Sequence, residues 1–248
     1  MNIKNYIQYL LQRLLGFEGY LFWFARFKVA TLKWDKKENH IFLLKHITLP
    51  EGSAILDVGA NLGILTVHFA RMFPNHPIVA FEPVTENYLI LCRMVKFYNL
   101  KNVSTYNIGL SDMNGELTML MPLEGGTRKQ GLSHVVTEPT PAATKGKVYH
   151  IAAFRLDDWW QSNRPKNSMG LLKMDVENHE SKVLLGSADC IRKFRPYVLA
   201  ELWDNENRVN ASAFFEEIGG YSCKVSINNS LVPMDIKNPS FQNFFFSP

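Results

Sequence analysis

The stretch Ala54-Ile-Leu-Asp-Val-Gly-Ala-Asn-Leu-Gly63 decides the fold class of this 248-residue chain. Its apolar first half predicts a short buried strand, and residues 62–72 follow the spacing of a helix. A strand that ends in glycine and opens into a helix places backbone N–H groups and the positive end of the helix dipole at the carboxyl edge of a sheet. Ligands of open α/β sheets bind at that edge. We therefore expect a ligand site at this turn.

Short apolar runs alternate with helical patterns along the rest of the chain. Strands are predicted at 54–58, 78–82, 103–107, 171–175 and 197–202, and helices at 62–72, 86–98 and 179–187. Strands separated by single helices indicate a parallel sheet with helices on both faces. Further strands are predicted at 116–121 and 148–154, around a long loop over 122–147, and at 221–227 and 241–246, where they close the sheet.

The composition excludes several classes of protein. With 46% hydrophobic residues and a net charge of +4, the chain is not a disordered protein. Its three cysteines, Cys92, Cys190 and Cys223, lie far apart, which argues against a disulfide framework or a thiolate zinc site. The longest stretch without Asp, Glu, Lys or Arg has 13 residues, too few for a membrane span. Polar residues interrupt the segment where a signal peptide would be apolar. We predict a cytoplasmic protein.

The first fifty residues differ from the rest in charge. They carry eight Lys or Arg against three Asp or Glu, whereas the remaining residues carry nineteen against twenty. A nucleic-acid-binding domain would need a basic surface on its folded body, so we expect no nucleic-acid partner. We predict an amino-terminal extension over 1–50 and one α/β domain over 51–248.

The extension itself combines an amphipathic helix with aromatic residues. Apolar residues at helical spacing over 3–15 predict the helix, and six aromatics follow between Phe17 and Phe27. Aromatic stripes at helical spacing usually pack, so we favour a segment that covers the core or a second copy of the chain. The alternative is that residues 1–28 lie in a membrane interface, at the inner face of the membrane.

The turn after the first strand predicts a nucleoside cofactor. Asn61 can adopt the left-handed conformation of a turn, and the absent side chains of Gly59 and Gly63 would let a ligand approach the backbone. Glu82 ends the second strand, where an acidic residue accepts hydrogen bonds from a ribose diol. The dinucleotide pattern G-x-G-x-x-G fails at Asn61 and Ile64, which disfavours NAD. Asp57 would repel a pyrophosphate and suits a cationic cofactor, which points to S-adenosylmethionine.

With these blocks, the sequence resembles the FkbM family of S-adenosylmethionine-dependent methyltransferases. The resemblance extends from Ile55 to Glu201 and rests on Asp57–Gly63, Phe81–Pro83, Gly109–Asp112 with Gly115-Glu116, Leu156–Asp158, and Lys173–Glu177 with Glu180, Leu184 and Gly186. It implies a class I methyltransferase fold (Rossmann-like), with a seven-stranded, mostly parallel sheet that has one antiparallel strand. It also implies that the turn holds the methionine part of the cofactor, Glu82 the ribose, and residues 108–110 the adenine. The cofactor-binding set is then Asp57, Gly59, Ala60, Asn61, Gly63, Glu82, Pro83, Gly109 and Leu110.

The segment after the fourth strand concentrates ionisable groups. Asp175, Glu177 and His179 are candidates for contacting the acceptor or removing its proton, with Lys173 as a fourth candidate or as a neutralising cation. Glu180 would favour the helix dipole. The family usually has Gly where this chain has Asn178, which we predict to cap the following helix.

Further side chains are candidates for the same region. A divalent metal held by Asp175, Glu177 and Glu201 is the alternative to a metal-free site, which we favour. Arg128 and His134 could cover the site from the long loop, although an exposed loop is favoured, and Trp159 and Trp160 are expected in the core.

The resemblance implies methylation of an oxygen acceptor, with a sugar or glycan precursor as the leading expectation and another small-molecule hydroxyl as a further one. Two alternatives remain open on the residues alone. One is an NAD-dependent oxidoreductase, and the other is a non-catalytic nucleoside-binding protein on the same fold.

Overall fold

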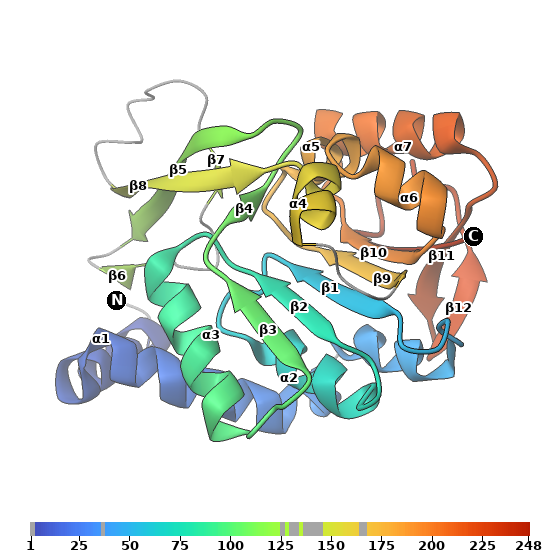
Figure 1. The fold of residues 1–248 in the computed structure, drawn as a ribbon. Coiled ribbons are helices and arrows are strands. Elements are labelled where there is room, and N and C mark those ends of the chain that lie inside the picture. The colour runs from blue at the N-terminus through green and yellow to red at the C-terminus, as the bar shows by residue number, and fades with distance from the viewer. Residues whose placement is uncertain (1–2, 36–37, 125–126, 129–133, 136–145, 164–167) are drawn as a thin grey trace.

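The computed structural model describes residues 3–35, 38–124, 127–128, 134–135, 146–163 and 168–248, and the side chains of all of these except 3–9, 122–124, 127–128 and 134. A central sheet lies between two layers of helices, and a second, smaller sheet stands at the edge where the parallel strands end (Figure 1).

Five parallel strands form the heart of the central sheet in the order β3-β2-β1-β9-β10. They are β1 (Ala54–Val58), β2 (Ile78–Phe81), β3 (Val103–Tyr106), β9 (Met169–Met174) and β10 (Tyr197–Glu201). All residues of β1, β2 and β9 are buried. Strands covered on both faces have continuous apolar sequences, which explains why the sequence identified them.

The sheet is closed by antiparallel strands, as expected, but with one strand more than the predicted seven. β13 (Asn243–Ser247) lies antiparallel between β10 and β11 (Ser222–Ile227). The additional strand, β12 (Ser230–Pro233), pairs with β11 at the edge. Asn228 and Asn229 join them with φ of 50° and 59°. Two consecutive left-handed residues form the tight turn that a hairpin favours, so these asparagines account for the eighth strand.

Helices cover both faces of the sheet. α2 (Ile64–Met72) and α3 (Thr85–Phe97) lie on one face, and α5 (Glu180–Leu185), α6 (Ala188–Phe194) and α7 (Glu206–Ile218) lie on the other (Figure 1). α4 (Leu156–Asn163) carries Trp159 and Trp160, which are 7% and 8% exposed. Their expected place in the core is confirmed.

The second sheet has the order β4-β8-β5-β6, with β7 paired to β5. Its strands are β4 (Gly109–Leu110), β5 (Gly115–Glu124), β6 (Thr127–Arg128), β7 (His134–Val135) and β8 (Gly146–Phe154). The strands predicted at 116–121 and 148–154 are therefore confirmed, and they extend into the predicted loop. The backbones of Arg128 and His134 belong to β6 and β7, whereas their side chains lie outside the described residues.

The amino-terminal segment packs against the body. α1 (Ile3–Thr31) kinks at Gly16, whose φ is 70°, and is followed by the 3-10 helices η1 (Leu32–Trp34) and η2 (Asn39–His46). Buried residues of α1, including Leu21, Phe22 and Val29, pack with Val67 of α2 and neighbouring residues of α3. The favoured packing of the aromatic segment is thus found for part of it, while the domain boundary at residue 50 stays a prediction. Across the described part of the chain, no helix has the length and apolarity that crossing a bilayer requires.

Candidate active site

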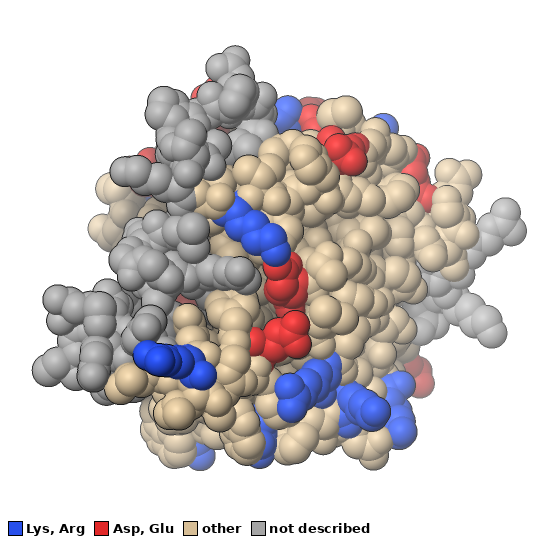
Figure 2. Space-filling view, turned by 90° about the vertical axis from the view of Figure 1, so that its left-hand side faces the viewer, with Lys and Arg blue, Asp and Glu red and all other residues tan. Residues whose placement is uncertain are grey.

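A cavity of about 270 Å³ opens at the carboxyl edge of the central sheet. The ends of β1, β2, β9 and β10 form its floor, and the second sheet forms one wall. Figure 2 looks onto this edge and shows acidic side chains near the middle of the face. Six of the predicted cofactor residues line the cavity: Gly59, Asn61, Glu82, Pro83, Gly109 and Leu110. Of the predicted catalytic residues, Asp175, Glu177 and His179 line it.

The turn after β1 has the predicted left-handed backbone, and its glycines also allow close packing within the protein. Asn61 has a φ of 50°, and Gly59 and Gly63 have φ of 73° and 81°. A Cβ on Gly59 would collide with the carbonyl oxygen of Asp175, and one on Gly63 would lie 2.7 Å from Leu91. The absent side chains therefore let the turn pack against the end of β9 and against α3. That they also let a ligand approach the backbone stays a prediction, and Gly59 does line the cavity.

Glu82 is fixed at the end of β2 by three donors. The backbone N–H of Asn61 donates to Oε2 over 2.8 Å, while Val84 N–H and the Asn87 amide donate to Oε1 over 2.9 and 3.3 Å. Burial raises the pKa of Glu82 to about 7, and the two backbone N–H groups oppose this shift. The Glu82 carboxylate therefore holds the turn after β1 (residues 59–63, the cofactor turn) in place, and Glu82 also lines the cavity.

Two buried oxygens beside Glu82 show that the residues present fit a nucleoside. Asn61 Oδ1 and Asn87 Oδ1 have no hydrogen-bond partner within the described structure, and both residues line the cavity. Asn87 is only 2% exposed. A buried acceptor without a donor costs free energy, and ribose hydroxyls or an amino group would supply donors at this position.

The wall beside Gly109 and Leu110 is apolar. It also contains Ile108, Phe81, Leu117, Met119, Val135 and Ile151. Most of these residues come from the second sheet, which packs as a small cluster with Val84. An apolar wall next to the polar groups of Glu82, Asn61 and Asn87 suits an adenine ring beside a ribose.

Asp57 and Lys173 lie beneath the turn rather than in the cavity. They are opposite each other in the β1/β9 register, with Lys173 Nζ 3.1 Å from Asp57 Oδ1. Asp57 is 0% and Lys173 4% exposed. Thr66 donates to Asp57 Oδ2 over 2.6 Å, and Lys173 Nζ donates to the Gly59 carbonyl over 3.1 Å. The neighbouring carboxylates raise the pKa of Lys173 although burial acts the other way. Neither side chain lines the cavity in which the cofactor and the acceptor would bind. Instead, the two side chains form an ion pair that supports the turn. Ala60 and Gly63 also lie outside the lining.

Four carboxylates form the opposite wall. Glu201 ends β10, Asp175 and Glu177 follow the neighbouring strand β9, and Glu38 comes from the amino-terminal segment. Burial, with the charges of Asp175 and Glu180, raises the pKa of Glu177 to about 7. Burial, with the charges of Asp175, Glu38 and Glu177, raises the pKa of Glu201 to about 8. Groups that ionise near neutral pH suit proton transfer.

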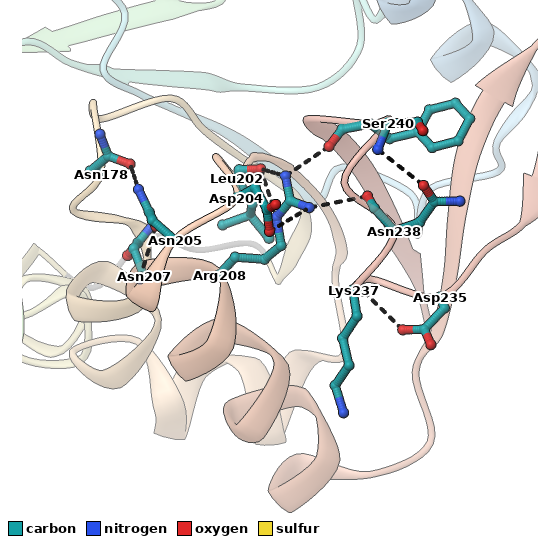
Figure 3. A network of polar contacts seen from close by, with 11 residues as sticks. Asn178, Leu202, Asp204, Asn205, Asn207, Arg208, Asp235, Lys237, Asn238 and Ser240 are labelled. Carbon is teal, nitrogen blue, oxygen red and sulfur yellow. Dashed lines mark hydrogen bonds and ion pairs between the residues drawn. The ribbon is translucent and has the colours of Figure 1, made fainter.

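The loop after β9 is shaped by left-handed residues instead of an asparagine cap. Glu177 and Asn178 have φ of 53° and 71°. The residue at the cap of α5 is His179, and no side chain caps this helix. Asn178 as N-cap is therefore wrong, because the turn needs a left-handed residue there, a conformation that Gly and Asn tolerate. Its Oδ1 accepts a hydrogen bond of 2.6 Å from Asn205, which ties the loop to the start of α7 (Figure 3).

Two neighbours of this loop have fixed partners. Glu180 is 1% exposed and accepts from Val176 N–H over 2.9 Å and from the Asn207 amide over 2.5 Å. Glu180 lies in the first turn of α5, as predicted. Its two hydrogen bonds also hold the loop after β9 and the start of α7 in position. His179 Nε2 lies 2.9 Å from Ser111 Oγ, and burial lowers the pKa of the imidazole. His179 thus reaches the cavity with one ring nitrogen already engaged.

The metal alternative has no geometric support where the structure is described. Within those residues, no three His, Cys, Asp or Glu side chains are grouped so that they could hold a metal ion.

Among the polar lining residues, neither Glu38 nor Asn87 was assigned to this site from the sequence, and Glu201 was assigned only as a metal ligand. Glu38 belongs to no motif, and its position depends on how residues 38–48 fold back onto the sheet. Asn87 lies in the first turns of α3, five residues after Glu82, and that short distance was a usable signal. For Glu201, the signal was its place at the end of a predicted strand, which indicates the same edge of the sheet.

The fold and the site define an α/β enzyme that binds a nucleoside cofactor at the end of β1, as class I methyltransferases do. The chain matches the family described as "Methyltransferase FkbM domain" over residues 57–222. It belongs to this family and is an S-adenosylmethionine-dependent methyltransferase. The alternative of an NAD-dependent oxidoreductase is thereby set aside.

Known relatives are similar at modest identity. The chain is 27% identical to "Methyltransferase 1" of Beauveria bassiana over 198 residues, which cover 76% of this chain and 79% of the relative. It is 27% identical to "2-O-methyltransferase NoeI" of Sinorhizobium fredii over 159 residues, which cover 61% and 64%. The crystal structure of methyltransferase FkbM from Methylobacillus flagellatus superposes with a TM-score of 0.53 at 13% identity, covering 81% of this chain and 44% of that one. This last likeness supports the fold.

Proposed function

We propose that this enzyme transfers the methyl group of S-adenosylmethionine to a hydroxyl of a sugar, a glycan precursor or another small molecule. The observation that carries the proposal is a single cavity that joins the cofactor turn and Glu82 to the carboxylates of Asp175, Glu177 and Glu201. Carboxylates accept hydrogen bonds from hydroxyls and can remove their protons. The name of the Sinorhizobium fredii relative, a 2-O-methyltransferase, supports an oxygen acceptor.

The two walls of the cavity, one apolar and one acidic, have different roles. The cofactor supplies an electrophilic methyl group when it is bound. Glu82 and the free oxygen of Asn87 would receive the ribose hydroxyls, and the apolar wall beside Leu110 would hold the adenine. The acidic wall would orient the acceptor hydroxyl and take its proton as the new oxygen–carbon bond forms and the carbon–sulfur bond breaks.

The proton acceptor is best treated as a coupled group. Burial and the charge of Asp175 raise the pKa of Glu177 to about 7 and that of Glu201 to about 8, so both carboxyl groups titrate near neutral pH. His179 is a weaker candidate for the base, because Nε2 is engaged with Ser111.

Cofactor choice is tested by calorimetric titration with S-adenosylhomocysteine and NAD in parallel. We expect binding of S-adenosylhomocysteine only, and a roughly ten- to hundredfold weaker Kd for Glu82→Ala, as expected when hydrogen bonds to a charged group are lost. Glu51→Ala, at an exposed glutamate before β1, is the matched control. Thermal melting establishes that Glu82→Ala is folded at the titration temperature. Unchanged affinity in folded Glu82→Ala would refute the placement of the ribose.

Acceptor chemistry is tested by incubating the enzyme with labelled S-adenosylmethionine and a panel of sugars and small hydroxyl compounds. Mass spectrometry then locates the transferred methyl group. We expect a methyl ether, and we expect Asp175→Asn and Glu177→Gln to slow its formation without weakening S-adenosylhomocysteine binding. A product methylated only on nitrogen or carbon would overturn the oxygen acceptor.

A further inference from the structure

An exposed aromatic stripe lies along the outer side of the amino-terminal helix. Trp23, Phe27 and Trp34 are 53%, 63% and 68% exposed. Separations of four and seven residues place them on one side of α1 and of η1, which continues it. The opposite side is the one that packs on α2 and α3 through Leu21 and Phe22. The helix therefore has one apolar side for the core and a second one that faces outward.

The stripe continues onto α3 and towards the amino terminus. Leu89 and Phe97 of α3 are 50% and 48% exposed. Before the kink at Gly16, the apolar residues of α1 are also exposed: Leu10, Leu11, Leu14 and Leu15. Large exposed apolar patches mark sites of interaction with other molecules or membranes.

Cations border these aromatic rings. The guanidinium of Arg26 lies 4.4 Å from the ring centroid of Trp23 and 4.1 Å from that of Phe97, and Lys33 Nζ lies 4.3 Å from that of Trp34. Arg93 and Lys96 of α3 are exposed nearby. Lysine and arginine side chains follow the lower part of the face in Figure 2, the side on which α1 lies in Figure 1. α1 and α3 each contain one acidic residue, Glu18 and Glu86, and Glu86 is paired with Lys147.

We propose that the α1–α3 surface, formed by the aromatic stripe with Leu89, Phe97 and the bordering cations, docks onto a lipid bilayer that carries anionic headgroups. Aromatic rings with adjacent lysine and arginine are the composition of a helix that lies in a membrane interface, with its rings at the headgroup level and its cations on the phosphates. Charge complementarity favours this occupant over a second copy of the chain, because two copies would bring the same cations together.

The test is flotation of the full-length protein with phosphatidylcholine vesicles, with and without phosphatidylglycerol, at low and high salt. We expect association only with the anionic vesicles and weakening by salt, because salt screens exposed charges. The double variant Phe27→Ser, Trp34→Ser should abolish flotation. Lys33→Gln with Lys96→Gln should weaken it about twenty-five-fold, since each cation near an anionic surface contributes roughly fivefold.

The matched control removes equally exposed apolar side chains from the opposite layer of helices. Leu185 on α5 and Val209 on α7 are 48% and 63% exposed, and Leu185→Ser with Val209→Ser should float like the unchanged protein. S-adenosylhomocysteine binding by every variant shows that each is folded, independently of the vesicle result. Absence of flotation, or equal flotation with neutral vesicles, would overturn the proposal. So would a dimer in solution that the Phe27→Ser, Trp34→Ser variant dissociates, since the surface would then join two copies.

Discussion

Replacing Lys173 by methionine separates a supporting role from a catalytic one. The substitution would leave the carboxylate of Asp57, which is 0% exposed, without the ammonium that lies 3.1 Å away. The Thr66 hydroxyl, at 2.6 Å, would be its remaining donor among the contacts of this side chain. Removing one partner of a buried ion pair costs about 3–5 kcal/mol. In a domain of this size, that corresponds to a fall in Tm of roughly 6–20 °C.

A double-mutant cycle isolates the pair. Asp57→Asn with Lys173→Met removes both charges, so its loss of stability should be smaller than the sum of the two single losses, by about 1–3 kcal/mol. The assay is equilibrium unfolding in urea, followed by the fluorescence of the buried Trp159 and Trp160. Lys182→Met is the control, because Lys182 forms an exposed ion pair with Asp112, and such pairs contribute less than about 1 kcal/mol.

The opposite outcome would refute the reasoning. If Lys173→Met unfolds at the same urea concentration as the unchanged protein but no longer transfers methyl groups, then Lys173 acts on the reacting groups and the ion pair does not support the turn. Additive losses in the cycle would likewise show that the two side chains do not interact.

Two further predictions concern the walls of the cavity. Gly59→Ala should destabilise the protein by about 2–4 kcal/mol, because the new Cβ would collide with the Asp175 carbonyl. The control is Gly219→Ala, also at positive φ but in open space, which should cost only about 1–2 kcal/mol. Equal losses of stability in urea unfolding would contradict the clash. In Glu201→Gln, the methyl-transfer rate should begin to rise at lower pH, because the substitution removes a negative charge that disfavours ionisation of the neighbouring carboxyl groups. An unchanged pH–rate profile would exclude the carboxylates of the acidic wall as the base. The pKa of Glu201 is raised to about 8 in the folded protein. Its contribution to stability is therefore fully present below the ordinary pKa of a glutamate and is lost as pH rises through about 8. The fall in Tm between pH 5 and 9 should be smaller in Glu201→Gln.

Much of the cofactor side could be predicted because its signals are local. The run before Gly59 is apolar, as a strand buried on both faces must be, and Asn61 adopts the left-handed backbone that its side chain tolerates. Glu82 lies at the neighbouring strand end, where parallel strands bring their carboxyl ends together. Each of these features depends on residues within one strand–turn–helix unit or on the next strand along the chain.

The amino-acid sequence by itself determined the strand–turn–helix units, the carboxyl edge that carries the site and the family of the enzyme. Only the tertiary structure decided that Lys173 neutralises Asp57 beneath the turn, that Gly59 makes room for the chain at Asp175, and that Glu38 joins the acidic wall. The physical reason is that these contacts join segments far apart in the sequence. They depend on the order and register of β1, β9 and β10 and on how residues 38–48 fold back, which no local pattern specifies.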